Sequence, residues 1–204
     1  MDSNESLITH LIRSGVLKTP DIIAAFEKID RQNFIRPDNF SDAYGDYPLP
    51  IGQNQTISQP YTVAFMLELL QAGSTDKILD VGSGSGWTTA LLADLVDKGG
   101  YVYGTEIIPE LVDFGRENLS KCGIVNADIY LAGQQLGLAE QAPYNRILVS
   151  ASGDDLPNEL LFQLGIGGRM VIPIQNSIWK VDKKGNKEFK YERFPGFVFV
   201  PLVH

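Results

Sequence analysis

The chain has 204 residues and a mass of 22.5 kDa, which suits one α/β domain, because chains divide into separate hydrophobic cores only beyond roughly 250 to 300 residues. Hydrophobic residues make up 44% of the sequence and charged residues 21%, a balance that argues against a disordered or fibrous protein. The net charge of −8 has the wrong sign for attraction to phosphate backbones. The composition therefore disfavours nucleic acid as the main substrate.

Charge is unevenly distributed along the chain. Residues 177–204 carry a net charge of +3, whereas the remainder carries −11. A basic segment beside an acidic body could attract an acidic partner, but a cluster of charges around a turn more often forms a solvated surface. We favour the solvated surface.

Cysteine and histidine are scarce. The single Cys122 has no partner for an internal disulfide, and the first residues are polar rather than basic and then apolar as in a secretory signal, so we expect a cytoplasmic protein. No apolar run approaches the roughly 20 residues that cross a bilayer. The two histidines, His10 and His204, and Cys122 lack the paired spacings of a zinc site, so we expect no metal.

The N-terminal third predicts helices around an irregular segment. Apolar residues at helical spacing between positions 7 and 12 indicate a first helix. Thr19-Pro20 supplies an N-cap and a first-turn proline for a second helix, and Pro60 begins a third. Residues 36–56 follow neither period and concentrate proline, glycine and tyrosine, which is typical of a long ordered loop or a linker. The aromatic residues favour an ordered, functional loop.

From Lys77 onward, short apolar runs alternate with helical stretches, the pattern of a parallel sheet with crossover helices. Strands are expected at 77–81, 101–106, 128–131, 146–151 and 169–174. Helices are expected at 86–96, 109–122 and 157–164. After Pro173 the pattern becomes antiparallel: residues 183–186 separate two extended stretches, and Phe197–Val200 reads as a last strand. The predicted fold class is α/β, with a mostly parallel doubly wound sheet and an antiparallel C-terminal hairpin.

The first predicted strand runs directly into the glycine-rich segment Gly82-Ser83-Gly84-Ser85-Gly86, and a helix follows. Glycines let the backbone approach a bound nucleotide, and a helix start presents unpaired N–H groups to it. Gly82, Ser83, Gly84 and Gly86 are therefore candidate cofactor-binding residues. Alone, such a segment is a weak signal.

Two acidic residues refine this interpretation. Asp80 precedes the glycines, and Glu106 ends the next strand, where a carboxylate can accept both ribose hydroxyls of a nucleotide. NAD enzymes share that acid, but their usual spacing is Gly-x-Gly-x-x-Gly, and Trp87 occupies the position of the last glycine here. The spacing favours S-adenosylmethionine. The alternative is that Asp80 only caps the helix and that Glu106 is solvated.

Nearly the whole chain resembles the protein-L-isoaspartate O-methyltransferase family, which methylates the abnormal isoaspartyl carboxylate of aged proteins. The segments similar to this family are Asp30-Arg31, Pro48-Leu49-Pro50-Ile51-Gly52, Gln55-Thr56-Ile57-Ser58-Gln59-Pro60, Leu79–Gly86, Ala142-Pro143-Tyr144, Gly167–Pro173 and Phe199-Val200-Pro201-Leu202. The resemblance implies a Rossmann-like methyltransferase domain over 1–204. Residues 1–60 would form a helical extension with the substrate loop, and 75–204 the cofactor-binding sheet core.

The resemblance also implies roles for individual residues. Ser58 would be catalytic and would hydrogen-bond the substrate carboxylate, with Ile57 beside it as a substrate contact and Thr56 as a cofactor contact in the same slot. The alternative for Ser58 is that it caps the helix that begins at Pro60. The implied cofactor is S-adenosyl-L-methionine, and the implied partners are isoaspartyl proteins and peptides, with no nucleic acid or membrane.

The chain departs from the family pattern at two positions. The family has a Gly-Asp-Gly block whose acid helps to hold adenine, and counting back from Ala142-Pro143-Tyr144 places Gly133 at the acidic position, beside Gln134. The aspartate that usually follows the Pro-Tyr pair is Asn145 here. Gln134 could replace the lost contact through its amide, or cofactor affinity and activity could be reduced. Gly133 and Gln134 are thus candidate cofactor contacts.

The scarcity of histidine suits transfer of a methyl group to a carboxylate. A sulfonium methyl is already activated, and a carboxylate with an ordinary pKa near 4 is already an anion at neutral pH, so no general base is needed. Two other functions stay open: a methyltransferase for a small carboxylic acid, and a cofactor-binding protein with reduced or lost activity. The retained Thr56-Ile57-Ser58 segment argues against the first, and Gly133 with Asn145 motivates the second.

Overall fold

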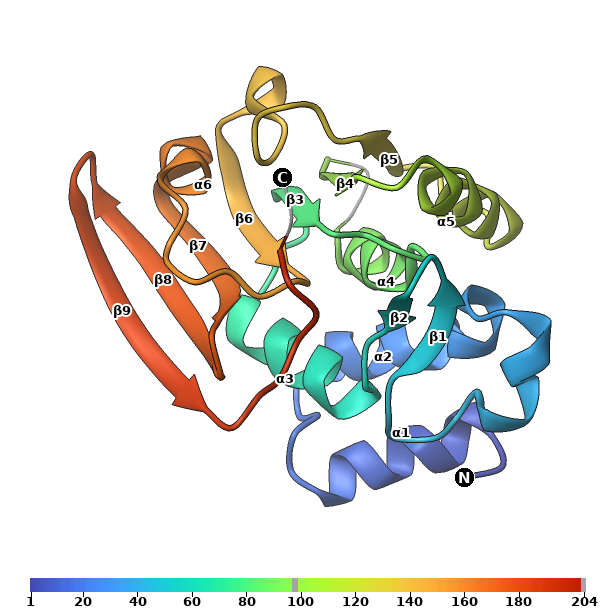
Figure 1. Ribbon diagram of the computed structural model, residues 1–204. Helices are drawn as coiled ribbons and strands as arrows, with labels where there is room; N and C mark the ends of the chain where they lie inside the picture. The colour runs from blue at the N-terminus through green and yellow to red at the C-terminus, as the bar shows by residue number, and fades with distance from the viewer. Residues whose placement is uncertain (97–98, 203–204) are drawn as a thin grey trace.

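The computed structural model describes residues 1–96 and 99–202, which form a seven-stranded sheet with helices packed on both faces (Figure 1). The strand order is β5-β4-β3-β6-β7-β8-β9. Pairing is parallel from β5 to β7 and antiparallel for the last two strands, which confirms the predicted fold class. The strands are β3 (Lys77–Val81), β4 (Tyr101–Glu106), β5 (Ala127–Leu131), β6 (Tyr144–Val149), β7 (Leu164–Ile174), β8 (Ser177–Gly185) and β9 (Glu188–Pro195).

The two faces of the sheet are covered unequally. One face carries the helices α1 (Asn4–Arg13), α2 (Pro20–Lys28), α3 (Pro60–Leu70), α4 (Trp87–Leu95) and α5 (Pro109–Lys121), and the other carries α6 (Asn158–Gln163). Successive strand residues point to opposite faces. Ile78 of β3 therefore joins the core under α1 to α5, whereas Leu79 joins the core under α6.

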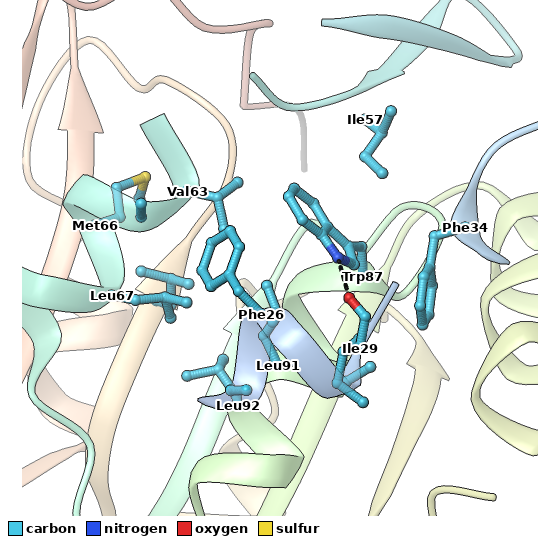
Figure 2. Packing of buried hydrophobic residues seen from close by; sticks show 14 of the residues in the cluster. Phe26, Ile29, Phe34, Ile57, Val63, Met66, Leu67, Trp87, Leu91 and Leu92 are labelled. Atoms are coloured by element: carbon cyan, nitrogen blue, oxygen red, sulfur yellow. Dashed lines mark hydrogen bonds between the residues drawn. The ribbon is translucent and has the colours of Figure 1, made fainter. Parts of the chain in front are cut away.

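Trp87 is the centre of the larger core. Figure 2 shows its ring surrounded by Phe26, Phe34 and Ile57, which come from widely separated parts of the chain. The indole N–H donates a hydrogen bond of 3.4 Å to the carbonyl of Ile29, and Phe26 meets the ring edge-on at 5.6 Å between centroids. The helix that follows the glycine segment is thereby attached to the N-terminal helices.

The predicted helices and parallel strands are present with small shifts of their ends. The largest difference is in β7, which begins at Leu164 rather than at 169. Gly165, Gly167 and Gly168 lower the strand propensity of that first half, but its pairing with β6 at Tyr144–Leu164 holds it extended.

The prediction of a loop over residues 36–56 was wrong in part. A short 3-10 helix, η1 (Arg31–Phe34), precedes the segment. The segment itself contains a second one, η2 (Pro37–Asp42), followed by the antiparallel pair β1 (Leu49–Gly52) and β2 (Gln55–Ile57). The hairpin turns at Gln53 and Asn54, both with positive φ, as a type I′ turn requires. Both strands are short and β1 contains Pro50, so the alternation of residues that predicts a strand is weak here.

The prediction of a last strand at Phe197–Val200 was wrong. Strand β9 ends at Pro195, and Gly196, with φ of 101°, turns the chain back across the molecule. The tail is then held by backbone hydrogen bonds of 2.8 Å from Ser152 N–H to the carbonyl of Val200 and from Leu202 N–H to the carbonyl of Ser152. Its apolar residues pack as an irregular segment rather than as a strand.

Lys180, Lys184 and Lys190 of the C-terminal segment pair with acidic residues of the same segment, and a solvated role for its surface stays a prediction. Lys180 pairs with Glu192 at 2.9 Å, and Arg169 of β7 pairs with Asp182 at 2.7 Å. Lys183 is buried and donates to the carbonyls of Leu161 and Leu164 at the end of α6.

The helices of residues 1–96 and 99–202 are all too short or too polar to span a membrane.

Candidate active site

A pocket opens at the carboxyl ends of β3, β4, β5 and β6. The chain places β4 and β5 on one side of β3 and β6 on the other, and such a switch in strand order is where open α/β sheets bind ligands. The space between its walls amounts to about 960 Å³ when the open mouth is counted.

The pocket is lined by segments at the four strand ends, by the β1–β2 hairpin with Ser58, and by the C-terminal tail. The lining residues are Ile51, Gln55–Ser58, Val81–Ser85, Trp87, Thr88, Thr105–Ile108, Ala132, Gly133, Gln135–Gly137, Ser150, Ala151 and Val200–Leu202. The predicted residues Thr56, Ile57, Ser58, Gly82, Ser83, Gly84, Glu106 and Gly133 are all brought together here. Asp80, Gly86 and Gln134 are not among the lining residues.

The glycine segment is a tight turn that needs glycine. Gly82, Gly84 and Gly86 all have positive φ, a conformation that other residues rarely adopt. Gly86 also lies against α5, where a Cβ would stand 3.1 Å from the carbonyl oxygen of Gly115. Gly82 and Gly84 therefore expose backbone to the pocket, whereas Gly86 allows α4 and α5 to approach each other.

Glu106 fixes the turn from the end of β4. The residue is only 7% exposed, and its carboxylate accepts hydrogen bonds from the backbone N–H groups of Gly84 at 3.0 Å, Ile107 at 2.8 Å and Ile108 at 3.1 Å. A carboxylate has about four lone-pair sites, so acceptor capacity is left for a ligand hydroxyl in the pocket. The alternative in which Glu106 is merely solvated is therefore wrong.

Asp80 lies beneath the pocket rather than in its wall. The side chain is fully buried, and one oxygen accepts a hydrogen bond of 2.6 Å from the Thr89 hydroxyl of α4, while the other has no partner among the described residues. Burial raises the pKa of Asp80 to about 7, the charge of Glu106 acts in the same direction, and the Thr89 hydrogen bond opposes both. Direct contact with a cofactor stays a prediction for this residue.

Ser58 follows β2 and lines the pocket beside Thr56 and Ile57. Within the described residues, no hydrogen bond joins its hydroxyl to the start of α3, and Gln59 occupies the N-cap position. The carboxylate of Asp46 serves that helix end instead, accepting from the N–H of Tyr61 at 2.8 Å. The helix-cap alternative for Ser58 is therefore not what the structure has, and its hydroxyl is available to a ligand.

The two departures from the family pattern lie at opposite ends of the sheet. Gly133 lines the pocket, where a Cβ would meet no atom within 4 Å, and the neighbouring wall residue is Gln135 rather than the expected Gln134. Asn145 lies at the amino end of β6, where its side-chain oxygen accepts from the N–H of Lys77 at 2.8 Å. Asn145 is thus a link between two strands and does not reach the pocket.

Several wall residues carried no assigned role in the sequence. The tail residues Val200, Pro201 and Leu202 close one side of the pocket, and Ile51 of β1 closes another. Both segments belong to the blocks that resemble the family, so their place in the pattern was a signal. The tail reaches the pocket wall through the bridge between Pro201 and Ser152, and Ile51 lies against the glycine turn, where a Cβ at Gly84 would stand 3.2 Å from it.

The side-chain chemistry of the lining is limited in kind. Its polar side chains are hydroxyls, amides and the carboxylate of Glu106, and the lining contains no histidine or lysine. His10 instead lies 3.4 Å from Asp46, and His204 is outside the described residues. No cluster of three or more potential metal ligands occurs within residues 1–96 and 99–202.

Fold and pocket together define a Rossmann-like protein of the S-adenosylmethionine-dependent methyltransferase class. The comparison of sequences also identifies the family within this class. The sequence profile of the family Protein-L-isoaspartate(D-aspartate) O-methyltransferase matches residues 2–204, and the chain belongs to this family.

Individual relatives support the same assignment. The chain is 42% identical to the protein-L-isoaspartate O-methyltransferase of Methanopyrus kandleri over 98% of this chain and 91% of that protein. It is 41% identical to the Aeropyrum pernix protein of the same name, over 97% and 78%. A solved Plasmodium falciparum structure superposes with a TM-score of 0.88 and 27% identity, over 100% and 99%. That structure is described as a candidate protein-L-isoaspartate O-methyltransferase in complex with S-adenosyl-L-homocysteine.

Proposed function

We propose that this chain transfers the methyl group of S-adenosyl-L-methionine to the side-chain carboxylate of L-isoaspartyl residues in damaged proteins and peptides. Membership of the family over residues 2–204 carries this proposal. The pocket supports it, because the Thr56-Ile57-Ser58 segment and the glycine turn both line a single cavity. Cofactor and acceptor would therefore meet at one place.

The pocket residues fit the cofactor. When bound, S-adenosyl-L-methionine supplies an activated methyl group on a positively charged sulfur. The backbone of Gly82, Ser83 and Gly84 would lie against the cofactor. Glu106 would accept hydrogen bonds from its ribose hydroxyls, and Gly133 would lie beside its adenine. Asp80 and Gly86 support this wall from behind through Thr89 and Gly115. Thr56 would complete the cofactor contacts. The cofactor contact that was predicted for Gln134 would be made by Gln135, which lines the pocket.

The residues of this chain contribute by orientation rather than by proton transfer. The acceptor is already an anion at neutral pH, so the Ser58 hydroxyl needs only to donate a hydrogen bond to the carboxylate oxygen that does not react. Ile57 would pack against the acceptor and exclude water. Holding the reacting atoms in line at near-attack distance lowers the barrier by up to roughly 7 to 11 kcal/mol, which is sufficient without a base.

Methylation of matched peptides tests the proposed acceptor. We expect an isoaspartyl peptide to be methylated at least about tenfold faster than the same sequence with a normal aspartyl residue, because a displaced carboxylate leaves the polar groups of a fitted pocket unpaired. Base-labile methyl esters measured with both peptides report the ratio. Equal labelling would contradict an isoaspartyl acceptor, and labelling of free small acids alone would favour a metabolite methyltransferase.

Gly133 offers a substitution that should increase cofactor affinity. Its φ is not positive and its Cβ direction is open, so an aspartate can be introduced without strain. Gly133→Asp should tighten S-adenosylmethionine binding by about tenfold through a charged hydrogen bond to the base. Gly133→Asn, of equal size, should do less, and calorimetry compares the two with the wild type. An unchanged affinity in Gly133→Asp would mean that Gln135 or the backbone already holds the adenine.

The proposal extends to organisation and location. Residues 1–204 would act as one methyltransferase domain, with 1–60 forming the extension and substrate loop and 75–204 the cofactor core. The partners would be isoaspartyl proteins and peptides in the cytoplasm, where the unpaired Cys122 would stay reduced. Fractionation of cells with an antibody to the chain checks the compartment.

A further inference from the structure

Arg31 is a buried cation behind the pocket. It is 0% exposed, and the ion pairs found among the described residues do not include it. Burial lowers the pKa of Arg31 to about 10, and the negative charge of Asp46 acts in the opposite direction, so the side chain is charged at neutral pH. Burying a charge is costly unless it is fully hydrogen-bonded.

The guanidinium binds four backbone carbonyls of the segments around the pocket entrance. One terminal nitrogen donates to Ala43 and Gly45, each at 2.9 Å. The other donates to Tyr47 at 2.9 Å and to Ser58 at 3.1 Å. All four terminal N–H groups are thus directed at chain that is 12 to 27 residues away in sequence.

The arrangement requires arginine rather than a positive charge alone. The guanidinium is planar and holds its donors in fixed directions, whereas a lysine ammonium presents three donors from one point. The group also lies over the Trp87 ring, 5.4 Å from its centroid, which fixes the plane. Trp87 is itself held by Ile29 (Figure 2). Only the Nε–H has no partner within the described chain.

We infer that Arg31 is a positioning residue that sets the orientation of Ser58 for methyl transfer by joining the entrance segment 43–47 to the carbonyl of Ser58. This inference rests on the proposed function. Arg31 does not line the pocket and acts only through the loop. Its hydrogen bonds do not reach the glycine turn or Glu106, because the backbone N–H groups of that turn donate to Glu106 and to the carbonyl of Thr105 at the end of β4.

Arg31→Lys tests the inference, with Arg146→Lys as the matched control. Arg146 also binds backbone carbonyls, those of Leu70 and Gln71, but at the other end of the sheet. Turnover of an isoaspartyl peptide is measured per molecule that binds S-adenosyl-L-homocysteine, so that loss of folded protein does not enter the rate. Arg31→Lys should lower kcat by about 10- to 100-fold, the effect of a displacement of about 1 Å at a reacting centre. Cofactor affinity should be nearly unchanged, and Arg146→Lys should retain its kcat.

A double-mutant cycle separates positioning from general support. If Arg31 acts through Ser58, adding Arg31→Lys to Ser58→Ala should lower kcat little further, whereas independent effects would multiply. Multiplying effects, an unchanged kcat in Arg31→Lys, or loss of cofactor binding in parallel with activity would each overturn the inference.

Amide hydrogen exchange provides a readout that does not depend on catalysis. Arg31→Lys should increase exchange in residues 43–58 and leave the protection of β3 and β4 unchanged, because local opening exposes only the segment that lost its hydrogen bonds. Uniform loss of protection, or none, would contradict a local role. If the wild type fails to methylate the peptide, the proposed function fails, and the exchange pattern still decides whether Arg31 holds the loop.

Discussion

Ser58→Ala should lower turnover on an isoaspartyl peptide by about 10²- to 10³-fold, the usual effect of losing one hydrogen bond that is made in the transition state. The Ser58 hydroxyl has no hydrogen bond to the start of α3 within the described residues, and Asp46 supports that helix end. Removing the hydroxyl should therefore leave the thermal midpoint and S-adenosylmethionine affinity almost unchanged. Kinetics with saturating cofactor and calorimetry on the same preparation measure both quantities.

Ser41→Ala is the matched control for this substitution. Ser41 lies in η2 near the same entrance, is exposed, and hydrogen-bonds only the neighbouring Asp42, so its removal should not change the rate. Full activity in Ser58→Ala would show that the acceptor is oriented by backbone groups alone. Recovery of a methylated Ser58 during turnover would show instead that the hydroxyl is a nucleophile.

The sheet core was predictable because its signals are local. The run from Lys77 to Leu95 contains a strand, three glycines and a helix in immediate succession, and each part follows its own period. The acid at Glu106 could be placed for the same reason, since the ends of adjacent parallel strands lie at one edge of a sheet. These expectations needed no knowledge of distant contacts.

The entrance and the tail could not be predicted in the same way. Phe197–Val200 has the composition of a strand, but its position is set by Gly196 and by Ser152, some 45 residues earlier in the chain. The carbonyls that surround Arg31 come from a loop and a short hairpin with no periodic pattern. The choice of Gln135 over Gln134 depends on the rotation of one loop after β5, which no pattern of residues specifies.

Glu106→Ala should weaken S-adenosylmethionine binding by about 10- to 100-fold, because a ribose hydroxyl would lose a charged acceptor worth roughly 1.5 to 3 kcal/mol. The substitution should affect the protein beyond the loss of the ribose contact. The carboxylate also accepts from three backbone N–H groups, including that of Gly84 in the glycine turn, and these donors would be left unpaired in a buried place. We therefore expect the thermal midpoint of the cofactor-free protein to fall as well.

Glu106→Gln and Glu110→Ala separate the two contributions. Glutamine keeps one acceptor oxygen but has an NH₂ donor where the second oxygen was, so it cannot accept from all three backbone N–H groups and the ribose, and its affinity should lie between those of the wild type and Glu106→Ala. Glu110 is an exposed acid at the start of α5, and its removal should change neither affinity nor midpoint. An unchanged dissociation constant in Glu106→Ala would remove Glu106 from the cofactor site. A lowered midpoint with unchanged affinity would limit Glu106 to holding the glycine turn in its binding conformation.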